Sequence, residues 1–238
     1  MTTAAKRIGL LFIHGIAGNN SIFEMLHPLA QQAADTEYIL LEGHGGNALD
    51  FSRTSMKRWK AQVYEAVAEF SGRCDSVVIV GHSMGCLFAL EQAAKGRVAA
   101  LFLMNPPLRI RPTLGALRNA FGVAMGLTHS RPVAAAAKKA YGISLDFNPF
   151  HYYGWPVRYM ELWREAGRIR EAVVSEVKCP VKVILSRLDE VVSLSSAEAF
   201  KNKCNAAVKV LAESSHYYYP DCDRERIIAL FADLLKEV

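Results

Sequence analysis

The chain of 238 residues is 51% hydrophobic and 21% charged, which is ordinary globular composition and excludes a disordered or collagen-like chain. Its apolar runs fall short of the roughly 18 residues that span a bilayer, and the apolar stretch behind Lys6 and Arg7 is too short for a secretory signal. Five scattered cysteines without CxxC spacing indicate neither a zinc site nor a disulfide framework, so we expect a cytoplasmic protein.

The net charge of +5 is concentrated in one segment. Residues 108–172 hold ten Lys or Arg against four Asp or Glu, so the rest of the chain is slightly acidic. Such a segment is either the solvated face of an insertion or a surface that favours anionic ligands or an anionic membrane. The arginines are spread among aromatic residues without a basic run or a recognised motif, so we expect no nucleic-acid partner.

Strand and helix patterns alternate through most of the chain, with one interruption. The first half predicts strands and helices in turn over 8–13, 22–34, 38–41, 54–70, 77–80, 84–95 and 99–104. Helical patterns then follow one another through an Ala- and Gly-rich stretch and over 132–141 and 156–173. Alternation resumes over 181–185, 193–203, 208–211 and 221–235. This order predicts an α/β fold with a mostly parallel, doubly wound sheet of about six strands. Residues 1–107 and 173–238 would form the core, and 108–172 a helical insertion.

The sequence Gly81-His82-Ser83-Met84-Gly85 stands where the third predicted strand ends and a helix begins. A serine at such a sharp turn is lifted clear of the sheet, and the flanking glycines allow close backbone approach. The N-terminus of the helix directs N–H groups and a positive dipole end toward a forming oxyanion. The pattern predicts Ser83 as a nucleophile.

A serine nucleophile needs a base and a group that orients the base, and on this architecture the order is Ser, acid, His. His216 follows the last predicted strand, and Asp189 stands at the end of the strand before it. Glu190 is adjacent to Asp189, but the strand-end position favours Asp189. Asn105 ends the fourth strand, the other place for an acid, and as an amide it does not compete.

The second oxyanion donor should come from the loop after the first strand, where Gly15 permits an unusual backbone turn. We therefore expect the backbone N–H groups of Ile16 and Met84 to form an oxyanion hole. His14 and His44 lie in similar loops, and we expect both to make structural hydrogen bonds.

These motifs together resemble the α/β-hydrolase superfamily: His14-Gly15, Gly43-His44-Gly45, Gly81 to Gly85, Asp189 and His216, in that order. The length and the segments around Gly43 and His216 are similar to bacterial carboxylesterases related to monoacylglycerol lipases. The resemblance implies ester hydrolysis through an acyl-enzyme, with no metal or organic cofactor. It also implies that residues 108–172 form a cap over the site. One departure is Cys86, where many relatives have glycine.

The substrate is the least determined part of the prediction. Short- to medium-chain acyl esters, or monoacylglycerol-like esters, are the expected small-molecule partners. Aromatic residues of the insertion would line an acyl pocket or simply pack it onto the core; the candidates are Phe150, Tyr153 and Trp155. Arg109, Arg111 and Arg118 would instead suit a substrate with a carboxylate or phosphate.

Several other functions are compatible with the same three side chains. Thioester, amide or carbon–carbon bond cleavage uses the same chemistry, and a weakly catalytic ligand receptor would retain the same residues. A dehalogenase is disfavoured because its nucleophile is normally aspartate. The sequence leaves the oligomeric state, monomer or dimer, open.

Overall fold

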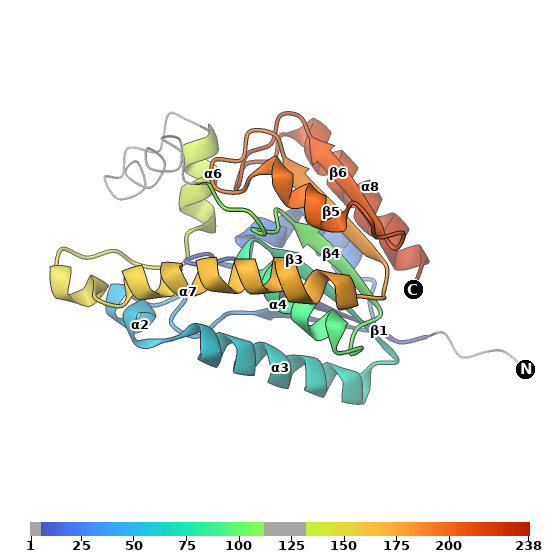
Figure 1. Cartoon of the computed structure of the whole chain (residues 1–238), viewed down its shortest axis with the longest axis horizontal. Helices are drawn as coiled ribbons and strands as arrows, with labels where there is room; N and C mark the ends of the chain where they lie inside the picture. Colours follow the sequence, from blue (N-terminus) through green and yellow to red (C-terminus); the bar gives the residue numbers. More distant parts are fainter. Residues whose placement is uncertain (1–5, 112–131) are drawn as a thin grey trace, which may run out of the picture.

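One parallel sheet of six strands, in the order β2-β1-β3-β4-β5-β6, organises the molecule (Figure 1). The computed structural model describes residues 6–111 and 132–238. Its strands are β1 (Ile8–Ile13), β2 (Asp35–Ile39), β3 (Ser76–His82), β4 (Ala100–Met104), β5 (Val181–Ser186) and β6 (Ala206–Leu211). The predicted α/β class with a parallel sheet of about six strands is confirmed.

The strands are continuous apolar runs because both faces of the sheet are covered. Successive side chains of a strand point to opposite faces. Leu11 and Ile13 of β1 therefore belong to one buried cluster, and Leu10 and Phe12 to the other. All seven residues of the central strand β3 are buried. The core thus consists of two apolar layers separated by the sheet.

Helices cover the two faces of the sheet unequally. One face carries η1 (Asn20–Leu26), α1 (His27–Ala30) and α8 (Asp221–Lys236). The other carries α3 (Met56–Arg73), α4 (Met84–Ala94) and α7 (Trp155–Arg168), which lie across the front of the molecule in Figure 1. Shorter segments are α2 (Ala48–Arg53), α6 (Pro132–Ala140), η2 (Pro149–Tyr152), η3 (Ile169–Val173), η4 (Val174–Glu176) and η5 (Leu194–Phe200).

Some predicted element boundaries were wrong. The helical stretch expected over roughly 22–34, with Pro28 either kinking it or starting its main part, is a 3₁₀ helix followed by a single α-helical turn with Pro28 near its start. The second strand begins and ends earlier than expected, because its N-terminal half pairs with β1 at an exposed edge and lacks an apolar signature. The helix expected over 193–203 is the short 3₁₀ helix η5.

The described part of residues 108–172 is helical, as predicted. It contains α6, η2 and α7, and α7 continues into the π-helical turn η3 before the chain re-enters the sheet. The expected helix in the Ala- and Gly-rich stretch lies outside the described residues. The division into a core and a cap stays a prediction.

Candidate active site

Ser83 occupies a strained turn between the central strand and the helix that follows it. It is the first residue after β3 and has φ +50° and ψ −121°, a conformation that non-glycine residues rarely adopt. Its N–H donates to the carbonyl of Met104 at 2.9 Å, which fixes the turn to the neighbouring strand. A side chain at Gly85 would place Cβ 2.0 Å from the Ile13 carbonyl oxygen. Strain held this firmly is typical of functional positions.

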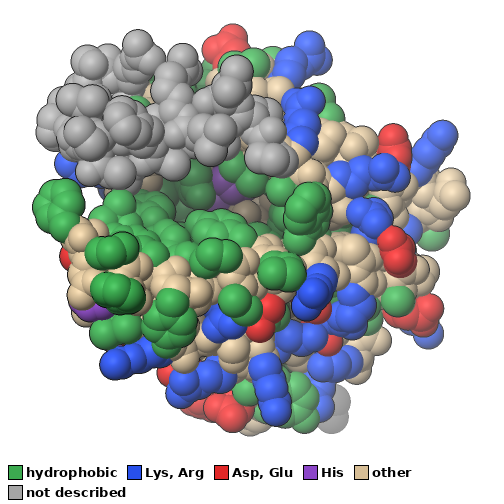
Figure 2. All heavy atoms as spheres, turned by 60° about the vertical axis from the view of Figure 1, so that its left-hand side comes forward, with side chains coloured by type: hydrophobic (Ala, Val, Ile, Leu, Met, Phe, Trp, Pro, Cys, Tyr) green, Lys and Arg blue, Asp and Glu red, His purple; other side chains and the backbone are tan. Residues whose placement is uncertain are grey.

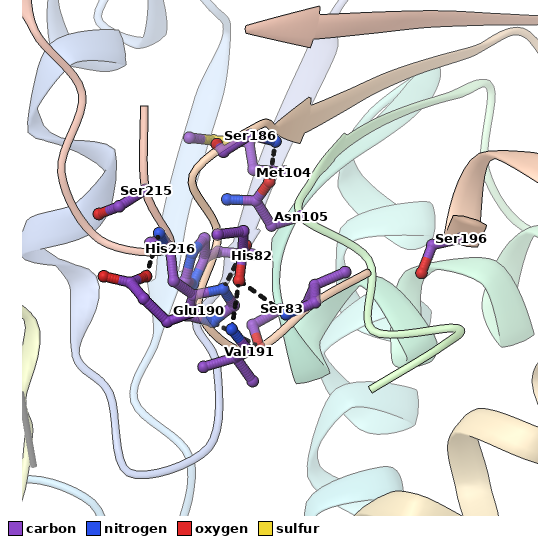
Figure 3. A network of polar contacts seen from close by, with 12 residues as sticks. His82, Ser83, Met104, Asn105, Ser186, Glu190, Val191, Ser196, Ser215 and His216 are labelled. Atoms are coloured by element: carbon purple, nitrogen blue, oxygen red, sulfur yellow. Dashed lines mark hydrogen bonds and ion pairs between the residues drawn. The ribbon is translucent and has the colours of Figure 1, made fainter. Parts of the chain in front are cut away.

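The structure brings Ser83, His216 and Asp189 together in one hydrogen-bonded chain. The Ser83 Oγ lies 3.1 Å from His216 Nε2, and His216 Nδ1 lies 2.7 Å from Asp189 Oδ2. All three residues are at most 4% exposed. A carboxylate only accepts, so Nδ1 carries the proton and Nε2 accepts from the serine hydroxyl. The loops after β3, β5 and β6 supply the three side chains at the carboxyl edge of the sheet, and Figure 3 shows Ser83 and His216 facing each other there.

Asp189 is held as a carboxylate that faces the imidazole. Burial acts to raise its pKa, but the charge and hydrogen bond of His216 together with two backbone donors outweigh burial and lower it. The N–H groups of Val191 and Val192 both donate to Oδ1 at 2.7 Å. Glu190 instead accepts from the backbone N–H of His216 at 3.2 Å. Of the two adjacent carboxylates, Asp189 is therefore the one that contacts the ring.

The predicted oxyanion donors border Ser83. A Cβ at Gly15 would lie 2.8 Å from the Ser83 Cβ, so the loop after β1 passes directly against the serine and continues into Ile16. Met84 is the first residue of α4, where an N–H has no partner within the helix. Both Ile16 and Met84 are buried. The role of these two N–H groups as oxyanion donors stays a prediction.

His14 and His44 are structural hydrogen-bonding residues, as the sequence predicts. His14 Nδ1 donates to the Gly15 carbonyl at 2.8 Å, and Nε2 accepts from the N–H of Leu41. His44 Nε2 accepts from the N–H of Ala17 at 3.0 Å. Burial lowers the pKa of His14 to about 4 and that of His44 to about 3, so both rings are neutral near pH 7. Together they hold the loop that carries Ile16.

Sequence reasoning missed a set of buried groups that hold the loop of His216. His82 Nε2 donates to the His216 carbonyl at 3.0 Å, and the Tyr219 hydroxyl donates to the same oxygen at 3.4 Å. The Asn105 amide donates to the Tyr219 hydroxyl at 3.1 Å and accepts from the N–H of Ser186 at 2.9 Å. Figure 3 shows four members of this network beside Ser83, namely His82, Asn105, Ser186 and His216. Two features of the sequence could have indicated these groups: His82 directly precedes Ser83, and Asn105 stands at a strand end.

The predicted substrate contacts lie at varied depth. Phe150 and Tyr153 are 82% and 62% exposed on the outer surface. Trp155 packs on Phe51 with ring centroids 4.9 Å apart, and its Nε1 donates to the Ala48 carbonyl. Trp155 therefore fastens the start of α7 to α2. A role of the three in substrate binding stays a prediction.

The chain matches a protein-family model and resembles known lipolytic enzymes. The model, described as an alpha/beta hydrolase family, matches residues 10–230. A thermostable monoacylglycerol lipase of Bacillus sp. (strain H-257) is 33% identical over 90 residues, which span 36% of this chain and only 35% of the relative. No helix in residues 6–111 and 132–238 is long and apolar enough to cross a membrane.

Two solved structures show the same fold at low identity. A chain from the structural work on LipS and LipT, two metagenome-derived lipolytic enzymes, superposes with a TM-score of 0.75 at 22% identity and covers 98% of this chain and 95% of that one. The monoacylglycerol lipase of Paleococcus ferrophilus superposes with a TM-score of 0.69 at 16% identity, covering 97% and 95%. Both likenesses extend over nearly the whole chain.

Proposed function

The chain belongs to the alpha/beta hydrolase family, and from this premise we propose that it is a serine hydrolase that cleaves carboxylic esters through an acyl-enzyme intermediate. The observation that carries the proposal is the buried chain of hydrogen bonds from Ser83 through His216 to Asp189. A hydroxyl, an imidazole held between the two groups and a carboxylate in this order form an activated nucleophile.

In the first half of the reaction, Ser83 Oγ attacks the ester carbonyl carbon while His216 Nε2 takes the hydroxyl proton. The carbonyl π bond opens and its electron pair moves to the oxygen. When the pair returns, the bond to the leaving alcohol breaks, and His216 gives its proton to that oxygen. In the second half, water attacks the acyl-enzyme in the same way, and Ser83 regains the proton as the acid leaves.

The surrounding groups stabilise the charges that develop in these steps. The N–H groups of Ile16 and Met84 would hold the oxyanion, each contributing about 3–4 kcal/mol in related chemistry. Asp189 keeps the proton of His216 on Nδ1 and stabilises the imidazolium. Two backbone donors fix its carboxylate, so little reorganisation is needed during the reaction.

The proposed substrates are short- to medium-chain acyl esters, with monoacylglycerol-like esters among them. The similarity of a 90-residue segment to a monoacylglycerol lipase supports this class. Residues 108–172 would act as a cap over the site, as the sequence predicts. The proposed chemistry uses only side chains and backbone groups of this chain and needs no metal or organic cofactor.

The test is the loss of reactivity on substitution of the nucleophile. Ser83→Ala should fold and should lose p-nitrophenyl butyrate hydrolysis by several orders of magnitude, together with labelling by a fluorophosphonate probe. Ser186→Ala is the matched control, because Ser186 is 1% exposed and its Oγ has no hydrogen-bond partner among the described residues. Unchanged turnover in Ser83→Ala, or a label mapped to another residue, would refute the proposal.

A further inference from the structure

Helix α7 has an unusual distribution of polarity, with charged groups on its buried side. Arg158 Nε lies 2.8 Å from Glu161, and both side chains are largely covered. Glu165 pairs with Lys60 of α3 at 3.0 Å and with Arg168 at 2.6 Å. These ion pairs satisfy the charges where α7 meets the core. Apolar side chains of the same helix are left on the solvent side.

The solvent side of α7 and the adjoining loop form a continuous apolar surface, which we call the aromatic face. A surface helix normally shows the opposite pattern, with polar residues outward. Phe147 is fully exposed and Trp163 is 63% exposed. Figure 2 shows the hydrophobic side chains gathered over this end of the molecule, beside a hollow. The aromatic face consists of Phe147, Phe150, Tyr153, Val157, Met160 and Trp163, which are 43–106% exposed.

The aromatic face is bordered by cations without carboxylate partners. Arg53, Lys57 and Arg164 are exposed, and within residues 6–111 and 132–238 none of them takes part in an ion pair. Arg53 ends α2, which packs against η2, and Arg164 lies beside Trp163 on α7. Glu161 and Glu165 are paired with cations of their own helix, and Asp146 accepts a hydrogen bond from His151 Nδ1 at 2.9 Å. Asp50 of α2 is exposed and forms no ion pair within the described residues, so the three cations outnumber the carboxylates that lack a charged partner at this border.

We propose that the aromatic face docks the protein on the surface of an anionic lipid bilayer. Aromatic side chains with one polar end, such as Tyr153 and Trp163, are favoured at the boundary between hydrocarbon and head groups. Exposed phenylalanines such as Phe147 and Phe150 gain free energy when they enter the acyl region. The unpaired cations supply the attraction to anionic head groups. A lipid surface satisfies both features at once, whereas a second copy of the chain would oppose like charges.

Docking in this orientation brings the candidate active site toward the lipid. Figure 2 shows a histidine side chain inside the hollow that adjoins the aromatic face. Esters held in the bilayer would thus reach the site from the docked side. This consequence rests on the proposed ester hydrolysis, whereas docking itself does not.

Vesicle flotation tests the proposal directly. The full chain is mixed with vesicles of phosphatidylcholine alone or of phosphatidylcholine with phosphatidylglycerol, at low and at high salt. We expect binding to the anionic vesicles only, weakened by salt. The fluorescence of Trp163 should shift to the blue on binding, and Trp163→Phe should abolish this shift, because Trp59 is fully buried and Trp155 is already hydrogen-bonded.

Two sets of variants separate the apolar and electrostatic contributions. The triple variant Phe147→Ser, Val157→Ser and Met160→Ser should lose at least ten-fold in affinity for anionic vesicles. Its matched control changes three exposed apolar residues elsewhere, Leu40, Val208 and Val210, to Ser and should bind normally. Replacing Arg53, Lys57 and Arg164 by Gln should lower the affinity for anionic vesicles about five-fold per cation. The control for charge replaces Lys178, Lys201 and Lys209 by Gln.

The experiments distinguish a failure of membrane docking from a failure of the proposed ester hydrolysis. The triple variant Phe147→Ser, Val157→Ser and Met160→Ser should still hydrolyse a monomeric water-soluble ester at the wild-type rate, so loss of docking alone does not affect catalysis. Vesicle binding without any ester turnover would refute ester hydrolysis and leave docking intact. Equal binding to neutral and anionic vesicles, no binding to either, or a dimer that the triple variant disrupts would overturn the docking proposal.

Discussion

The substitution Asp189→Asn tests how the carboxylate controls the base. In the native protein, Oδ1 of Asp189 accepts from two N–H groups at 2.7 Å, and Oδ2 accepts from His216 Nδ1 at 2.7 Å. An asparagine has only one oxygen. The two backbone donors of Val191 and Val192 require that oxygen, so the amide NH₂ must face His216. The ring is then forced into the tautomer with the proton on Nε2, which cannot accept the proton of Ser83.

The expected loss follows from this change of tautomer. Where an asparagine replaces the acid of such a triad, kcat falls by about 10⁴-fold, which corresponds to roughly 5.5 kcal/mol of transition-state stabilisation. We expect a loss of this order in kcat for p-nitrophenyl butyrate, with KM little changed, because the geometry of the site is retained. Steady-state kinetics near pH 7.5 together with a thermal melt would measure the effect and verify folding.

The neighbouring carboxylate provides a matched control for this prediction. Glu190→Gln keeps an oxygen that accepts from the backbone N–H of His216, and we expect less than about a ten-fold loss, in keeping with one neutral hydrogen bond. A loss below ten-fold in Asp189→Asn would contradict the tautomer argument. A greater loss in Glu190→Gln than in Asp189→Asn would show that Asp189 is not the acid.

Two further predictions concern the buried groups around the site. Tyr219→Phe removes a donor to the His216 carbonyl, so kcat should fall about five- to ten-fold with KM unchanged, whereas Tyr218→Phe should have little effect; equal effects would contradict a positioning role. Burial lowers the pKa of His14 to about 4, below the ordinary value near 6.5, so the unfolded chain binds the extra proton first as the pH falls. The free energy of unfolding should therefore drop between pH 6.5 and 4, by on the order of 3 kcal/mol for this residue. Urea titrations should show a shallower pH dependence in His14→Asn than in His27→Asn, and identical slopes would refute the assignment.

Local features of the sequence were sufficient for the fold and for the three central residues. Continuous apolar runs predict buried parallel strands, because both faces of such a sheet are covered. The glycines around Ser83 indicate a turn that other residues would obstruct, and strand ends on a parallel sheet meet at one edge. The order of Ser83, Asp189 and His216 along the chain therefore predicted a meeting that the structure shows to be a hydrogen-bonded chain.

Tertiary structure alone decided the interactions that depend on distant segments. The donors to the His216 carbonyl come from His82 and Tyr219, and Asn105 joins this network from a third strand end; no spacing in the sequence encodes these meetings. The polarity of α7 was equally hidden. The sequence of α7 has a charged face and an apolar face, and only packing decides which of the two is buried. In the structure the charged face has partners on α3, and the aromatic face is left at the surface.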